Sequence, residues 1–80
     1  MSAASAPSSK PYDDRTDAEV REGLRRICRT SRSDDEVRRR IREELGYPYA
    51  DPPISSVSDS GRYVCVDVTI HGPSGDTISV

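Results

Sequence analysis

The sequence has no phenylalanine and no tryptophan, and its 80 residues include only two cysteines and one histidine. A core built without Phe or Trp has to use aliphatic side chains and tyrosines, whose hydroxyl groups need water or a hydrogen-bond partner. The single histidine, His71, and two isolated cysteines form neither a nucleophilic triad nor a cluster with metal-ligand spacing. These absences predict a protein that is not an enzyme and that uses no cofactor or metal.

Two further absences concern location. The chain does not open with a basic segment followed by an apolar one, and no apolar run reaches the length of a membrane span. We therefore expect a cytoplasmic protein without membrane contact. In such a reducing compartment a disulfide between Cys28 and Cys65 is not expected, and both residues are predicted to be buried thiols.

The first fifteen residues are dominated by serine, alanine, proline and charge. This composition cannot bury enough apolar surface to offset the entropy of ordering the chain. We expect a disordered tail over residues 1–15 and a single small domain over residues 16–80. A domain of that size obtains only a few kcal/mol from its core, which favours a marginal monomer or one completed by a partner.

The same helix-start pattern occurs twice in the domain. Thr16 and Ser33 are each followed by a glutamate at the third position after them, which is the signature of a capping box. The pattern predicts helices over residues 17–29 and 34–46, the second ended by Gly46. Each predicted helix carries one narrow apolar stripe. The stripes are Val20, Leu24, Ile27 and Cys28 in the first helix, and Val37, Ile41 and Leu45 in the second.

The C-terminal part of the sequence alternates between apolar and polar residues, as strands do. One face of the predicted strand carries Val64, Val66, Val68 and Ile70, and the other carries Tyr63, Cys65, Asp67 and Thr69. The sequence HGPSGD then turns the chain into a second strand, so a β-hairpin is expected. Because an isolated hairpin is only marginally stable, a third strand is needed, and residues 54–57 (ISSV) are the local candidate.

The expected fold class is therefore α+β: two amphipathic helices packed on a C-terminal antiparallel β-hairpin, with a third short strand as a candidate addition, behind a disordered N-terminal tail. The last predicted strand contains Ile78 and Val80 on one face and lies at an edge of the sheet. Unpaired backbone groups at such an edge can pair with another chain. Homodimerisation through this edge, or addition of a partner's strand, is a hypothesis.

In the arginine run at residues 38–40, Arg39 and Arg40 have carboxylates four residues away on both sides, and Arg38 has one on its N-terminal side. Such pairs each stabilise a helix by about 0.2–0.5 kcal/mol, so we interpret this run as a solvated, self-neutralised face. The less compensated positive charge lies near the end of the first predicted helix. It consists of Arg25, Arg26, Arg29 and Arg32.

These four arginines are one predicted binding surface for a protein partner. The rigid YPYADPP segment is another, because tyrosine is favoured in interface hot spots and this segment carries Tyr47 and Tyr49. The alternative for the two tyrosines is that their rings cap a small core. The expected function is that of a small regulatory or adaptor protein that acts by protein–protein contact, with a partner of unknown identity.

The alternative function is that of a small DNA- or RNA-binding regulator. Its contact residues are the arginines at the junction of the two helices, provided that the helices pack antiparallel. They are Arg25, Arg29, Arg32, Arg38 and Arg42. The net charge of −2 disfavours this function, because nucleic-acid-binding domains are usually basic. Prolines and serines also follow the second helix, where a helix-turn-helix protein would need a recognition helix.

Overall fold

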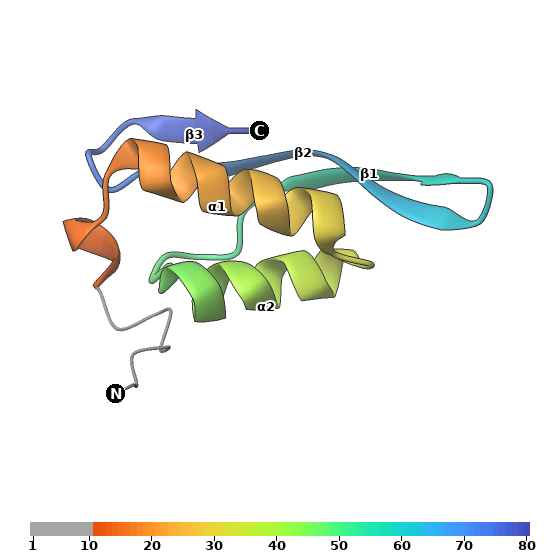
Figure 1. The fold of residues 1–80 in the computed structure, drawn as a ribbon, viewed down its shortest axis with the longest axis horizontal. Helices are drawn as coiled ribbons and strands as arrows, with labels where there is room; N and C mark the ends of the chain where they lie inside the picture. The colour runs from red at the N-terminus through yellow and green to blue at the C-terminus, as the bar shows by residue number, and fades with distance from the viewer. Residues whose placement is uncertain (1–10) are drawn as a thin grey trace.

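The structure is a computed structural model that describes residues 11–80. A short 3-10 helix precedes two α-helices and three strands. The elements are η2 (Tyr12–Asp14), α1 (Asp17–Thr30), α2 (Asp34–Leu45), β1 (Ile54–Asp59), β2 (Arg62–His71) and β3 (Thr77–Ser79). The strands form one antiparallel sheet in the order β1-β2-β3, and α1 packs on β2 and β3 with α2 beside it (Figure 1). The expected α+β fold is confirmed, and the candidate third strand is β1.

The two helices begin at the predicted residues because their capping groups are in place. The Thr16 hydroxyl accepts a hydrogen bond from Glu19 N at 3.1 Å, and Thr16 N donates to Glu19 Oε1 at 2.9 Å, which completes a capping box. At α2 the Ser33 hydroxyl accepts from Glu36 N at 3.1 Å, but the Glu36 carboxylate accepts from Arg32 N at 2.8 Å. The second cap therefore reaches one residue further back and holds the turn between the helices.

The helices pack closely against each other. A Cβ atom at Gly23 would lie 2.8 Å from Leu45 Cδ2, so a side chain at this crossing would displace the Leu45 side chain. Near the other end of the pair, the Arg40 guanidinium donates to Glu44 Oε2 at 2.7 Å and to Thr30 Oγ1 at 2.6 Å. Only 18% of the Arg40 side chain is exposed, so this arginine joins the helices rather than lying on a solvated face.

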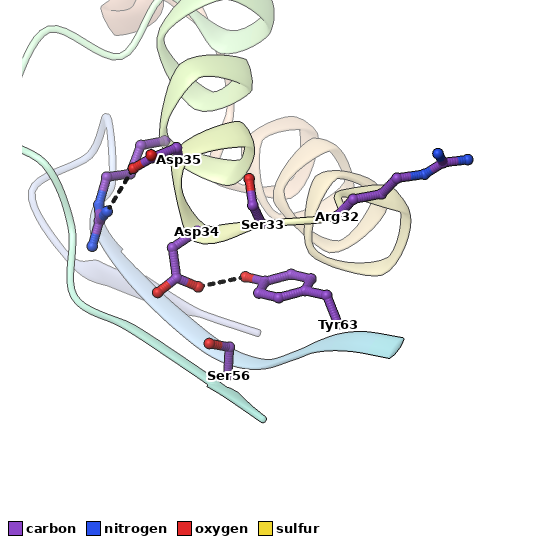
Figure 2. Close-up of a pocket in the computed structure, with 7 residues that line it drawn as sticks. Arg32, Ser33, Asp34, Asp35, Ser56 and Tyr63 are labelled. Atoms are coloured by element: carbon purple, nitrogen blue, oxygen red, sulfur yellow. Dashed lines mark hydrogen bonds and ion pairs between the residues drawn. The ribbon is translucent and has the colours of Figure 1, made fainter. Parts of the chain in front are cut away.

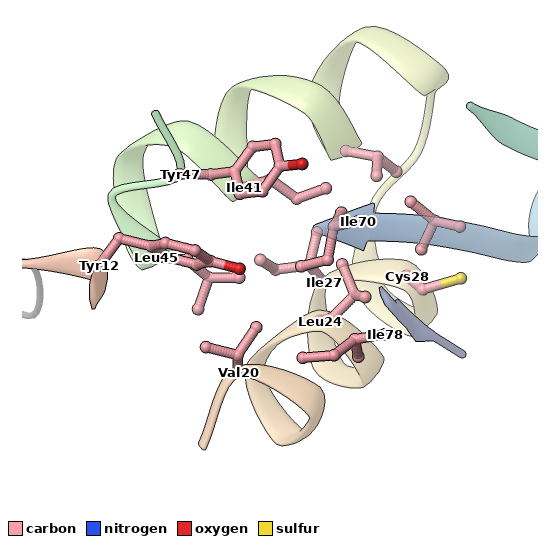
Figure 3. Packing of buried hydrophobic residues seen from close by; sticks show 12 residues of the cluster. Tyr12, Val20, Leu24, Ile27, Cys28, Ile41, Leu45, Tyr47, Ile70 and Ile78 are labelled. Carbon is pink, nitrogen blue, oxygen red and sulfur yellow. The ribbon is translucent and has the colours of Figure 1, made fainter. Parts of the chain in front are cut away.

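The core lies where the two apolar stripes meet β2 and β3 (Figure 3). Its aliphatic members are Val20, Leu24, Ile27, Val37, Ile41, Leu45, Val68, Ile70 and Ile78. Tyr12 and Tyr47 are also buried, and both hydroxyls use the backbone of His71: Tyr12 donates to its carbonyl at 2.6 Å, and Tyr47 accepts from its N–H at 2.9 Å. Two tyrosines thus take the place of Phe and Trp without leaving a hydroxyl unpaired.

The burial of Tyr12 moves the beginning of the ordered region. The predicted tail runs to residue 15, yet the Tyr12 ring packs edge-on against Tyr47 with 5.3 Å between ring centroids. A single aromatic side chain in a polar segment is enough to anchor residues 11–15 to the core. Residues 1–10 of the predicted tail lie outside the described residues.

The faces of β2 follow the predicted alternation only in its second half. Val68 and Ile70 are buried as predicted. In the first half the faces are exchanged: Val66 is 55% exposed, whereas Tyr63 and Cys65 pack against the core. The predicted burial of the first half of the valine face is therefore wrong.

A β-bulge causes this exchange. Ser55 on β1 pairs with Asp67 on β2, but the next residue, Ser56, pairs with Cys65, so that Val66 is an extra residue in the ladder. Because side chains alternate with a period of two, one inserted residue reverses which face is buried on the far side of the bulge.

Cys28 and Cys65 form a disulfide, so the prediction of two separate thiols is wrong. Their Cα atoms lie 5.4 Å apart, a normal separation for a disulfide. The bulge accounts for the pairing, because it turns Cys65 toward α1, where Cys28 lies on the buried stripe. The bond joins α1 to β2 across 37 residues of sequence.

Neither of the two helices has the length and apolar character that crossing a membrane requires, among the residues that the structure describes.

Candidate interaction surface

Positively charged side chains from three segments meet at one end of the molecule. Arg29 near the end of α1, Arg32 in the turn to α2 and Arg62 at the start of β2 line one shallow hollow. Arg25, one helical turn before Arg29, lines the neighbouring hollow together with it. All four side chains are exposed. We name these residues, Arg25, Arg29, Arg32 and Arg62, the arginine surface.

Arg62 reaches this surface through the turn of the β1–β2 hairpin, which projects beyond the helices (Figure 1). Ser60 and Gly61 form the turn with φ angles of 55° and 78°, as the two-residue turns favoured in hairpins require. Sequence reasoning missed Arg62 because the pairing of β1 with β2 was only a candidate. The signal that could have identified it is the Ser-Gly pair between two strand-like runs.

Few carboxylates compensate the arginine surface. The Arg25 guanidinium lies 3.9 Å from the Glu22 carboxylate. No residue of the segment 11–80 forms an ion pair with Arg29, Arg32 or Arg62. Asp59 is the cross-strand partner of Arg62 and offsets part of its charge. This end of the molecule is therefore locally positive although the whole chain is not.

Arg26, the other arginine of the predicted α1 cluster, lies at the border of the arginine surface. It shares one hollow with Arg25, Arg29 and Glu22. It also lines a second hollow that contains Glu44 of α2. Among the described residues it forms no ion pair, but carboxylates line both of these hollows and offset part of its charge.

Arg38 and Arg42, which the nucleic-acid alternative also needs, have carboxylate partners. Arg38 lies 3.5 Å from Asp35. Arg42 pairs with Asp51 beyond the end of α2, away from Arg32 at its beginning. The structure therefore does not bring these two arginines into one uncompensated patch with Arg25, Arg29 and Arg32.

The arginine run of α2 is largely self-neutralised. Of the predicted pairs four residues apart, those with the following glutamates are confirmed, Arg39–Glu43 at 3.9 Å and Arg40–Glu44 at 2.7 Å. The pairs with the preceding carboxylates are not formed within residues 11–80, where Asp35 lies near Arg38 instead. The Asp34 carboxylate has another use, because it accepts a hydrogen bond from the Tyr63 hydroxyl at 2.7 Å.

This bond ties β2 to the beginning of α2 (Figure 2). The hydrogen bonds from Tyr63 and then Ser56 lower the pKa of Asp34. Burial, together with the bond to Asp34, raises the pKa of Tyr63 to about 12. In Figure 2 the Arg32 side chain points away from this pair, which leaves its guanidinium free for the arginine surface.

Beside the arginine surface, one edge of β2 has no strand partner. β3 pairs with residues 69–71 of β2, and Val80 extends this pairing by exchanging two hydrogen bonds with Val68, at 3.2 and 3.3 Å. Over residues 62–66 no strand in the described part of the chain pairs with β2 on this side. Backbone groups along such an edge can pair with an additional strand.

The two predicted contact tyrosines have different environments, at the end of the molecule opposite to the arginine surface. Tyr47 is buried, so its ring belongs to the core and is not available to a partner. Tyr49 is 44% exposed, and its ring packs edge-on against Tyr47 and His71 at centroid distances of 5.3 and 4.9 Å. The core-capping alternative is confirmed for Tyr47, and of these two rings only that of Tyr49 is exposed to solvent.

No protein-family model, curated protein or solved structure matches this chain. The chemistry of the surface therefore has to be argued from its own side chains. Guanidinium groups bind carboxylates and phosphates through paired hydrogen bonds, and an open strand edge binds extended backbone. Within residues 11–80 no group of three or more His, Cys, Asp and Glu side chains is arranged to hold a metal ion.

Proposed function

We propose that this protein is a small, non-enzymatic adaptor or regulator that binds a protein partner through the arginine surface. The observation that carries the proposal is the meeting of Arg29, Arg32 and Arg62 around one hollow, with no ion pair to other described residues. Arginine is enriched among the residues that dominate binding energy at protein interfaces. The adjacent open edge of β2 supports the proposal, because it offers backbone pairing next to the charged groups.

A DNA- or RNA-binding regulator is the alternative, since guanidinium groups also bind phosphates. The proposal favours a protein because the chain has a net charge of −2 and because Arg38 and Arg42 are engaged by Asp35 and Asp51. A dedicated nucleic-acid surface usually carries a larger continuous patch of positive charge.

The cytoplasmic location stays a prediction, and the disulfide gives a way to test it. Disulfides persist in oxidising compartments and are rare in the cytosol. Alkylating free thiols at the moment of cell lysis would show whether Cys28 and Cys65 are bonded in the cell. Two alkylated cysteines agree with the cytoplasm, whereas a protected disulfide places the protein in an oxidising compartment.

The proposal is tested by affinity capture from an extract of the host, with and without nuclease. The full chain is compared with R29E/R32E, which reverses charge on the arginine surface, and with R39E. Arg39 is a matched control because it is exposed and lies on α2 beside Glu43, outside the surface. We expect the same proteins to be retained by the wild type and by R39E, to be lost with R29E/R32E, and to be unaffected by nuclease.

Far-UV circular dichroism and thermal unfolding establish that each variant is folded, and R29Q/R32Q serves if the charge-reversed chain is not. Retention that disappears with nuclease supports the nucleic-acid alternative. Retention that is equal for all variants contradicts any role of the arginine surface.

A further inference from the structure

We propose that the partner contributes an extended strand with alternating acidic and apolar residues, which pairs with residues 62–66 of β2 beside α1. This inference rests on the proposed function and specifies the chemistry of the partner. It follows from three features that lie together: an open strand edge, the arginines above it and the exposed valines around it.

The backbone of β2 provides the first step. The pairing with β3 ends where Val80 exchanges hydrogen bonds with Val68, and the following positions toward Arg62 have no partner strand among the described residues. A strand placed there would continue the line of β3 along β2. The space extends over residues 62–66, close to the usual length of a strand. An extended segment of a partner can therefore satisfy the free donors and acceptors.

The side of the added strand that faces the helices determines where acidic residues belong. Tyr63 and Cys65 face the helices, so partner residues opposite them point the same way. Arg25 and Arg29 of α1 line the hollow at this position, together with the disulfide, Val66 and Val80. Carboxylates on this side would reach the guanidinium groups, and their stems would cover the exposed Val66.

The other side of the added strand determines where apolar residues belong. Val64 is 38% exposed on the outer face of the sheet, and it lies opposite Val57 of β1, which is also exposed. A β-branched residue of the partner beside Val64 would extend this apolar row across a third strand. Because successive residues of a strand alternate between faces, the partner strand alternates between acidic and apolar residues.

The same charges argue against a second copy of this chain as the occupant. Pairing two β2 edges about a two-fold axis would bring two arginine surfaces together, and like charges placed against each other cost several kcal/mol. Only an acidic strand neutralises the surface that borders the edge. Nucleic acid could meet the arginines, but it offers no backbone amide ladder for the strand.

The probe is a synthetic peptide of alternating glutamate and valine, EVEVEVE, with blocked ends. Two control peptides separate its properties: EEEEVVV has the same composition without alternation, and KVKVKVK has alternation with the opposite charge. Titration calorimetry with the full chain should show binding of EVEVEVE, with EEEEVVV weaker by at least about tenfold and no binding of KVKVKVK. Hydrogen exchange should slow at those amides of residues 62–66 that point away from β1.

Charge reversal locates the site. R25E/R29E should no longer bind EVEVEVE and should bind KVKVKVK, whereas R39E should bind both peptides as the wild type does. If R25E/R29E does not fold, R25Q/R29Q should weaken EVEVEVE by at least about tenfold without gaining KVKVKVK.

Equal affinity for EVEVEVE and EEEEVVV, or no slowing of exchange over residues 62–66, would overturn strand pairing. Concentration-dependent dimerisation in light scattering, with these amides protected before any peptide is added, would overturn the acidic partner in favour of a second copy. Displacement of EVEVEVE by duplex DNA, with DNA binding more tightly and losing affinity steeply as salt rises, would favour nucleic acid as the occupant. Each of these results leaves the capture experiment with R29E/R32E to decide the proposed function separately.

Discussion

The two ends of this molecule differ in how completely their polar groups are paired. At the tyrosine end, both buried hydroxyls, of Tyr12 and Tyr47, bond to the backbone of His71. The turn before β3 is held as well, because the Ser74 hydroxyl donates to the Asp17 carboxylate at 2.6 Å. At the arginine end, guanidinium groups border an open strand edge, and of these only Arg25 has an ion pair within residues 11–80. The polar groups of the first end are bonded within the fold, whereas those of the second are available to the partner that we propose.

The β-bulge and the disulfide mark the border between the two ends. On one side of Val66 the sheet buries the face that the sequence pattern predicts, and on the other side it buries the opposite face. Beyond the bulge the Cys28–Cys65 bond and the hydrogen bond from Tyr63 to Asp34 hold β2 to the helices. The arginine end is thus held by a few specific links rather than by a continuous apolar core.

The largest expected effect is a loss of folding stability when the tyrosine end is disrupted. Tyr47→Ala removes a buried ring and should lower the free energy of unfolding by about 3–5 kcal/mol, measured by urea denaturation. Tyr49→Ala is the matched control, since the exposed ring should cost less than about 1 kcal/mol. If Tyr47→Ala does not fold, Tyr47→Phe is used, which keeps the ring but loses the hydrogen bond from His71 N. It should lower the free energy of unfolding by about 1–2 kcal/mol. Similar small losses for Tyr47→Ala and Tyr49→Ala would contradict the comparison.

The next effect concerns the arginine end. Reduction of the disulfide releases a crosslink across 37 residues and should lower the free energy of unfolding by about 3–4 kcal/mol. Native-state hydrogen exchange should quicken more at residues 62–66 than at residues 69–71. The C28S/C65S variant should be insensitive to reductant and serves as the control. An unchanged urea midpoint after reduction would contradict this prediction.

The smallest expected effect is a dependence of stability on pH at the arginine end, through the Tyr63–Asp34 bond. The pKa of Asp34 is lowered in the folded protein, so its contribution to stability is present above about pH 4 and is lost as the pH falls through the folded value. The pKa of Tyr63 is raised from 10.0 to about 12, so its contribution is present below pH 10 and is lost as the pH rises through that range.

The measurement is the difference in urea midpoint between the wild type and Tyr63→Phe. It should be constant from about pH 5 to 9 and should decrease on both sides of this range. Tyr49→Phe, which changes an exposed tyrosine at the other end, should give no such profile. A Tyr63→Phe difference that is independent of pH would show that the Tyr63–Asp34 bond does not stabilise the fold.

Local signals made the helices predictable, and long-range geometry made the rest difficult. Thr16, Glu19 and Gly46 act on neighbouring residues, so the ends of α1 and α2 could be placed to within a residue. The bulge at Val66 depends on how two strands pair, and no residue near it indicates that a bulge occurs there. The error in the faces of β2 concealed the disulfide, because it placed Cys65 away from Cys28.

The candidate surface could also be predicted only where its residues are close together in the sequence. Arg25, Arg29 and Arg32 were identified because they follow one another along a helix and its turn, where carboxylates are few. Arg62 was missed because only the hairpin brings it there. Tyr47 and Tyr49 were treated as equivalent because the sequence cannot tell which of two alternate rings meets the core.

The extra residue at Val66 acts on β2 much as a frameshift acts on a coding sequence. Every residue between it and the hairpin turn keeps its identity but is displayed on the opposite surface. If β2 paired with β1 without this bulge, Val64 would lie in the interior and Cys65 and Tyr63 would point outward, so that the covalent link to α1 and the bond to Asp34 would be lost together. The arrangement of the whole hairpin arm thus depends on the register in which β2 pairs with β1, and not only on the composition of the strand.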